Sequence, residues 1–364
     1  MNYKEALFFI GKCLTINHEA HNKKSVVAQL QTEKIDWDMV VQVSTAHYVF
    51  PALYLNLKKA NFTEYLPEEL VNYMDHITSL NRERNKAIIN QVRDLQKLLV
   101  ANGIEPIFLK GSGNLVSGLY DDIAERMVGD IDFLVKENQA ELAQHMLLDT
   151  DYLPLKEGMY LINRHLKRLY SKSALAAVEV HKKIVTGPFN RLFSNHKLMV
   201  NAGTKNVLHQ EDQLFLNIAS HQINDKGKLK FQISLKNAYD VYLLSHRFNI
   251  NINSFQNQKY FDLINNYIYT TNKIFNSNHL VSIETQKAKW NFMFVCFFAK
   301  YRKFNRVKNK VIDFCLGTQN RLILIVKSMY SSEHRKFLLY LVRSKDWQER
   351  KLIQFGLKKP KPNE

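Results

Sequence analysis

The chain has 364 residues, of which 46% are hydrophobic and 12% aromatic, and its formal net charge is +17 at pH 7. This composition excludes an intrinsically disordered protein, and the length allows two or three domains with a substantial core. The cysteines are far apart and form no CxxC pair, which indicates neither a disulfide framework nor a zinc site and predicts a cytoplasmic location. No signal peptide is predicted. No transmembrane segment is predicted either, because the most apolar run, residues 292–299, is too short to cross a bilayer and is expected to form a buried helix.

Residues 1–102 are predicted to form an N-terminal helical region. Four apolar residues recur with the spacing of one helix face: Ile88, Val92, Leu95 and Leu99. The Asn102-Gly103 pair that follows them is typical of a helix end. Earlier stretches show the same kind of pattern, at residues 3–14, 37–58 and 67–80.

The pattern changes at Ile104, and residues 103–204 are predicted to form a small core that contains a mixed sheet. The first predicted strand, residues 106–109, ends at a glycine, and a helix over residues 112–120 follows it. Further strands are expected around Asp130–Val135 and at residues 164–170 and 176–185, with a helix over residues 138–148. The predicted fold class is therefore α+β, with this core flanked by helical regions on both sides.

The C-terminal region, residues 205–356, is predicted to be helical and basic. From residue 286 to the C-terminus there are 19 lysines and arginines against five acidic residues, so +14 of the net charge of +17 lies in this segment. Such asymmetry indicates an anionic partner, which could be nucleic acid, anionic lipid or a phosphorylated acceptor. The last residues, 357–364, are predicted to be disordered.

Two carboxylates, Asp130 and Asp132, lie one residue apart in an otherwise apolar strand. Because side chains alternate along a strand, both point to the same side, where they can bind Mg²⁺ or Mn²⁺ together with phosphate oxygens. Glu179, in the later run Val178-Glu179-Val180-His181, is the candidate third acid and a candidate general base on the acceptor. The alternatives are exposed acids at a strand end and, for Glu179, an ion pair with a following lysine.

A phosphate-binding turn is predicted at Gly111 and Ser112, because a strand that ends in Gly-Ser before a helix presents backbone N–H groups to an anion. Lys110 and Arg126 are predicted to neutralise a triphosphate, or alternatively to pair with the acids. His181 lies on the same strand face as Glu179, where it could orient that acid, contact substrate or be structural.

The order of these motifs resembles the uncharacterised nucleotidyltransferase family of the polymerase-beta superfamily. The resemblance covers about residues 30–245 and includes Lys110-Gly111, Arg126, Asp130-Ile131-Asp132 and Val178-Glu179-Val180-His181. It implies a metal-dependent nucleotidyltransferase with Mg²⁺ on Asp130, Asp132 and Glu179. The expected reaction moves a nucleoside monophosphate from an NTP such as ATP to an unknown acceptor and releases pyrophosphate. The helical His221 and Asp240 also match family positions, and an interhelical contact is the favoured role for both.

Two other functions remain open at the level of sequence. The first is a catalytically degenerate protein that binds nucleotide or nucleic acid through the basic C-terminal region, with aromatic side chains stacking on bases. The second is attachment of that region to an anionic membrane surface near the acceptor. The sequence does not identify the acceptor or the preferred NTP.

Overall fold

The computed structural model describes residues 1–32, 34–154, 164–186, 198–201, 205–248, 250 and 260–354. It divides into two compact units, the first made of Met1–Leu155 with Arg164–Asn305 and the second beginning at Arg306. The first unit contains the sheet together with helices that precede and follow it, so the α+β fold class predicted from the sequence is confirmed. The predicted tail, residues 357–364, lies outside the described residues. The division into N-terminal, core and C-terminal regions stays a prediction.

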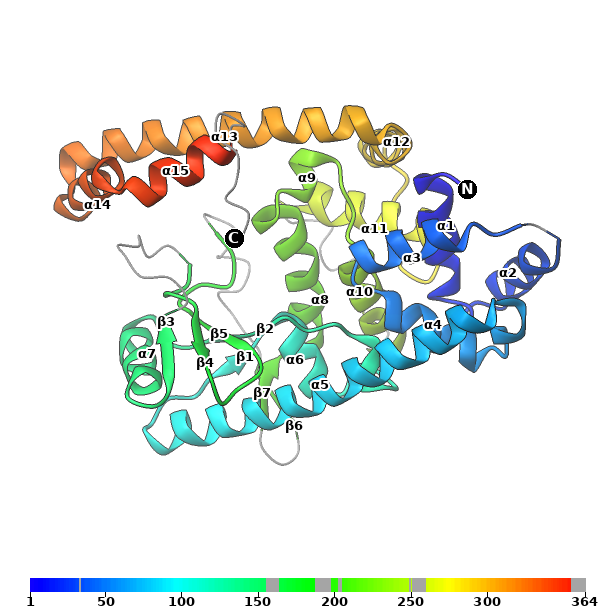
Figure 1. Cartoon of the computed structure of the whole chain (residues 1–364), viewed down its shortest axis with the longest axis horizontal. Coiled ribbons are helices and arrows are strands. Elements are labelled where there is room, and N and C mark those ends of the chain that lie inside the picture. The colour runs from blue at the N-terminus through cyan, green and yellow to red at the C-terminus, as the bar shows by residue number, and fades with distance from the viewer. Residues whose placement is uncertain are drawn as a thin grey trace. The chain divides into compact units, whose positions relative to one another are not determined.

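The described strands form one mixed sheet with the order β3-β4-β5-β2-β1-β7-β6. Their bounds are β1 (Ile107–Phe108), β2 (Asp130–Leu134), β3 (Tyr152–Pro154), β4 (Leu169–Ser171), β5 (Ala177–His181), β6 (Leu198–Asn201) and β7 (Lys205–Leu208). The central pair β2–β5 is parallel, as is β1–β7, whereas the other pairs are antiparallel. The sheet therefore places β2 between β5 and β1 (Figure 1).

The helices before the sheet are α1 (Tyr3–Cys13), α2 (Ala20–Thr32), α3 (Trp37–Ala46), α4 (Phe50–Lys59) and α5 (Glu68–Ala101). The apolar face predicted on α5 is buried, with Ile88 and Val92 fully inaccessible to solvent. Buried amides on the same helix hold the loop that leads into β2, because Asn81 and Asn85 both donate to the Arg126 carbonyl oxygen, at 3.2 and 2.7 Å. Helix α5 thus contributes an apolar face to the core and also positions the loop that leads into β2 (Figure 1).

Some of the remaining helices of the first unit pack on the sheet, and others pack on neighbouring helices, including α1. These remaining helices are α6 (Lys110–Val116), α7 (Ala140–Leu148), α8 (Gln210–Ala219), α9 (Gly227–Lys230), α10 (Leu235–Phe248), α11 (Phe261–Phe275) and α12 (Gln286–Lys300), and a π-helical turn, Ser220–Asn224, continues α8. The second unit contains most of α13 (Arg302–Tyr330), α14 (Ser332–Arg343) and α15 (Lys345–Gln354).

Three details differ from the sequence prediction. Residues Lys205–Leu208 form β7 rather than the start of a helix, because they pair with β1 and β6. Tyr152–Pro154 and Leu198–Asn201 add unpredicted strands, β3 and β6, at the two edges of the sheet. The apolar run at residues 292–299 is helical but only partly buried, since one face of α12 packs inward while Met293 and Phe297 are 53% and 43% exposed. Among the described residues, no helix has the length and apolarity needed to span a bilayer.

Candidate active site

Asp132 and Glu179 are brought together by the parallel pairing of β2 and β5. Asp132 is the direct register partner of Glu179, and neighbouring strands are about 4.8 Å apart, so side chains on one face meet. Asp132 is 3% exposed, and the Glu179 side chain is 13% exposed. The register of the β2–β5 pairing, which strand alternation alone does not specify, therefore places both carboxylates on one face of the sheet.

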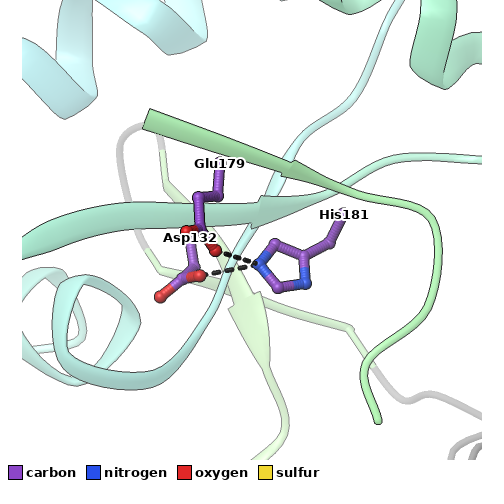
Figure 2. Close-up of side chains that lie close together, drawn as sticks. All are labelled: Asp132, Glu179 and His181. Atoms are coloured by element: carbon purple, nitrogen blue, oxygen red, sulfur yellow. Dashed lines mark hydrogen bonds and ion pairs between the residues drawn. The ribbon is translucent and has the colours of Figure 1, made fainter. Parts of the chain in front are cut away.

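His181 completes a cluster with these two acids, as Figure 2 shows. Its Nε2 lies 2.6 Å from Asp132 Oδ1 and 3.5 Å from Glu179 Oε2. The ligand atoms of the three residues all lie within 4.8 Å of one another, and the His181 side chain is fully buried. Two carboxylates and an imidazole at this separation could hold a divalent metal ion.

Lys110 reaches the same carboxylate from the other side of β2. Its Nζ lies 2.7 Å from Asp132 Oδ1. The chain turns sharply where β1 meets α6, because Lys110 has a φ of +51°, in the left-handed region that non-glycine residues rarely adopt. Backbone strain at this position thus accompanies the placement of the ammonium group on Asp132.

Asp130 interacts with a different cation, Arg168. Arg168 Nη2 lies 2.6 Å from Asp130 Oδ2, and its Nε lies 3.6 Å from Glu179 Oε1. Arg168 immediately precedes β4, and the antiparallel β4–β5 pairing brings it beside Glu179. A single guanidinium therefore connects the predicted acids Asp130 and Glu179.

The charges around Asp132 control its protonation. Burial by itself would raise the pKa of the Asp132 carboxyl, but Lys110 and His181 hold this pKa well below its ordinary value. Burial and the neighbouring Asp132 charge raise the pKa of Asp130 despite opposition from Lys110 and Arg168. Burial also opposes ionisation of Glu179, but the hydrogen bond from His181 leaves its pKa lowered. Asp132 and Glu179 are thus ionised at neutral pH, as metal ligands must be.

A cleft of about 190 Å³ lies beside the cluster. Five of the predicted site residues line it, namely Lys110, Gly111, Arg126, Asp130 and Asp132. Arg164, Asn224 and Lys236 also line it, and within the described part of the chain Arg164 Nη1 and Asn224 Nδ2 are buried without a hydrogen-bond partner. Burial and the nearby Arg126 charge lower the pKa of Lys236 to about 8. The cleft therefore presents several hydrogen-bond donors next to the carboxylates, an arrangement suited to an anion.

Residues 33–259 match the model of a protein family described as "Uncharacterised nucleotidyltransferase". The chain belongs to this family. The resemblance inferred from the motifs is thereby confirmed, and the match includes every residue of the Asp132–Glu179–His181 cluster. A search of curated proteins gave no match.

Two predicted phosphate-binding residues of this nucleotidyltransferase family member also make contacts within the protein. The Ser112 hydroxyl, which is buried, donates to the Leu109 carbonyl oxygen at 3.0 Å. Arg126 is also buried and donates from Nε to Asp240 Oδ2 at 3.0 Å. A Cβ atom built on Gly111 would lie 3.4 Å from Arg126 Nη2, so this guanidinium packs against the predicted turn. Their roles toward substrate remain predictions.

The two family-like helical residues make structural contacts within the protein, but their hydrogen-bond partners lie in loops and not on a second helix, which is where the sequence had favoured them. Asp240 accepts hydrogen bonds from both Arg126 and Tyr120, and His221 Nε2 lies 3.0 Å from the Gln232 carbonyl oxygen. Sequence reasoning missed Arg164, Arg168, Asn224 and Lys236. The two arginines lie in a run predicted as strand, but the strand pattern gave no signal that they face the acids.

Proposed function

We propose that the protein is a Mg²⁺-dependent nucleotidyltransferase that moves a nucleoside monophosphate from an NTP to an acceptor. The observation that supports this proposal is the cluster of Asp132, Glu179 and His181, whose ligand atoms lie within 4.8 Å of one another. The cleft beside it has lysine and arginine side chains in its wall next to the carboxylates. Family membership supports transferase chemistry in general.

The donor set fits a divalent metal ion. Asp132 Oδ1 accepts hydrogen bonds from Lys110 and His181, whereas Oδ2 accepts none from the described residues. Asp132 and Glu179 of the cluster would hold the ion, and Asp130, which pairs with Arg168 and lies outside the cluster, is the proposed third carboxylate. Carboxylate oxygens are the ligands that Mg²⁺ prefers, with Mn²⁺ an alternative. When bound, the metal would neutralise phosphate charge and stabilise the charge that develops during phosphoryl transfer.

The protein's own residues would bind and orient the NTP. Lys110, Arg126 and Lys236 line the cleft, so their positive charges would face the triphosphate and the departing pyrophosphate. Glu179 would accept the proton of the acceptor hydroxyl as its oxygen attacks the α-phosphorus. The new bond joins the acceptor oxygen to the α-phosphorus, the bond between that phosphorus and the bridging oxygen to the β-phosphate breaks, and pyrophosphate leaves.

The test is transfer of label from each α-labelled NTP to cell-extract fractions, with and without Mg²⁺, together with pyrophosphate release. Asp132→Asn and Glu179→Gln should each lower transfer at least about 100-fold because both remove negative charge from the cluster. Asp149→Asn is the matched control, since Asp149 is an exposed carboxylate at the end of α7, and its transfer rate should be unchanged. Circular dichroism would verify folding. Undiminished transfer by folded Asp132→Asn and Glu179→Gln proteins would disprove the proposed roles.

We infer a second function, attachment to an anionic lipid surface, from the exposed face of α13. Five aliphatic side chains recur at helical spacing and are between 48% and 66% exposed: Val307, Val311, Leu322, Ile325 and Met329. Residues 306–354 contain 11 lysines and arginines against four acidic residues. An apolar stripe with cationic surroundings is typical of helices that lie on anionic membranes. A second copy of the chain is a less suitable partner for this face, because it would bring positive charge against positive charge. Nucleic acid is also less suitable, because it would leave the apolar stripe exposed to water.

Co-sedimentation with vesicles tests this attachment. The protein should bind vesicles that contain phosphatidylglycerol but not pure phosphatidylcholine, because the lysines and arginines need anionic headgroups. Val311→Asp with Ile325→Asp should abolish binding. The control, Gln319→Glu with Asn320→Asp, adds the same charge at exposed polar positions of α13 and should retain most of the binding. If the protein bound RNA or DNA but neither kind of vesicle, the lipid proposal would be wrong and nucleic acid would be the partner of this face.

A further inference from the structure

A second pocket of the first unit adjoins the candidate cleft. It has a volume of about 400 Å³, and Asp225, Lys236 and Asn237 line both spaces. Its other walls come from α1, the end of α3, the π-helical turn after α8, the segment of residues 231–234, α12 and the first residues of α13. None of the residues predicted from the sequence to bind metal or phosphate lines this pocket, so the proposed chemistry leaves its purpose open.

The cleft by itself is too small for a whole nucleoside triphosphate. Its volume of about 190 Å³ is below the range of about 300–1,000 Å³ that is typical of pockets for ligands of that size. The adjoining pocket provides the missing space, and Lys236 forms part of the wall of both. A ligand whose phosphates lie in the cleft can therefore extend past Lys236 into the pocket.

The chemistry of the pocket wall differs from that of the cleft. Asn305 is 4% exposed and lines the pocket, and its Oδ1 is buried without a hydrogen-bond donor among the described residues. An unsatisfied buried acceptor costs about 1–3 kcal/mol, so a donor supplied by a ligand is expected there. Phosphate oxygens carry no such donor at neutral pH, whereas every standard nucleobase has an N–H on its pairing edge.

Aromatic side chains form another part of the wall. Phe231 and Phe298 line the pocket with ring centroids 6.0 Å apart, and Tyr48 lies beneath the Lys236 ammonium, which is 4.8 Å from its ring centroid. Aromatic surfaces next to a hydrogen-bonding amide are the usual environment of a nucleobase, because the ring faces stack and the edge is read by polar groups.

We propose that this pocket is the nucleobase subsite of the NTP, with the Asn305 amide binding the base edge. The inference rests on the proposed nucleotidyltransferase function, because the triphosphate in the cleft is what brings the base to the pocket. Lys236 then lies at the junction between triphosphate and nucleoside. Asn305 determines affinity for the nucleoside part of the substrate and contributes nothing to the triphosphate.

Binding measurements separate the two parts of the ligand. Isothermal titration calorimetry with each NTP and with inorganic tripolyphosphate, all in the presence of Mg²⁺, would be compared between wild type and Asn305→Leu. Wild type should bind at least one NTP about ten-fold more tightly than tripolyphosphate. Asn305→Leu should lower the affinity for that NTP at least five-fold and leave the affinity for tripolyphosphate unchanged, because only the base edge loses its hydrogen-bond partner. Phe298→Leu removes a ring while keeping an apolar side chain. It should likewise lower the affinity for the NTP and leave the affinity for tripolyphosphate unchanged.

Asn309→Leu is the matched control. It makes the same change one turn further along α13, at a residue that does not line the pocket, and should leave both affinities unchanged. Equal weakening of NTP and tripolyphosphate by Asn305→Leu would overturn the subsite, as would unchanged NTP affinity in both folded pocket variants. Failure of wild type to bind either ligand would instead reject the proposed function, and the inference with it.

Discussion

At the scale of single residues, the Arg126–Asp240 pair shows how a predicted ligand-binding side chain can also support the fold. Arg126 is 5% exposed and Asp240 is fully buried, and Tyr120 donates a second hydrogen bond to the same carboxylate at 2.7 Å. Burial raises the pKa of Asp240, while Arg126 opposes that increase. Removal of the guanidinium would leave a carboxylate buried without its counter-charge, which is strongly unfavourable.

We therefore predict that Arg126→Met lowers the free energy of unfolding by about 3–5 kcal/mol, measured by urea denaturation. The double variant Arg126→Met with Asp240→Leu should recover most of this loss, because neither charge then remains buried. If the single variant kept wild-type stability, the pair would not be structural, and the predicted contact of Arg126 with triphosphate would become its main role.

At the scale of elements, the close approach of α6 to β1 positions the start of the site. A Cβ atom at Gly113 would lie 2.5 Å from the Phe108 carbonyl oxygen, a backbone atom that cannot turn away. We predict that Gly113→Ala costs about 1–3 kcal/mol of stability, because α6 must move away from the strand. Gly129→Ala is the control, since a Cβ there meets nothing within 4 Å, and its thermal midpoint should stay near that of wild type. Equal midpoints for the two variants would show that α6 can shift freely.

At the scale of the whole first unit, His47 links three helices that are far apart in the sequence. The backbone N–H of Leu235, on α10, donates to His47 Nδ1 at 3.2 Å, and His47 Nε2 lies 2.8 Å from the hydroxyl of Tyr3, on α1. Because Nδ1 accepts a hydrogen bond, His47 is neutral in this arrangement. Burial, with further contributions from His221 and Arg302, lowers the pKa of His47 to about 3.

This pKa predicts a loss of stability in acid. The unfolded chain binds a proton at His47 below about pH 6.5, whereas the folded protein binds it only near pH 3, so stability falls by up to about 1.4 kcal/mol per pH unit between those values. Above about pH 6.5, His47 contributes no pH dependence. Urea denaturation from pH 7.5 to pH 4 should show a smaller slope for His47→Gln than for wild type. Identical slopes would mean that the pKa of His47 is the same in the folded and unfolded protein, and would contradict the prediction.

The sequence by itself determined the features that depend on local pattern. The i, i+4, i+7 spacing of Ile88, Val92 and Leu95 was sufficient to predict the buried face of α5. Strand alternation placed Asp130 and Asp132 on one face, and the order of short motifs indicated the family that the match over residues 33–259 confirms. Such patterns are visible in one sequence because the period of a helix or a strand relates residues only a few positions apart.

Only the tertiary structure decided which charges meet. Asp132 contacts His181 across 49 positions and Lys110 across 22, and Arg126 reaches Asp240 across 114. No local period relates such residues, because strand pairing and helix packing bring them together independently of their sequence separation. The same holds for Asn305, which reads as an ordinary helical residue until the fold places its amide, buried and without a donor, in the wall of a pocket beside the cleft.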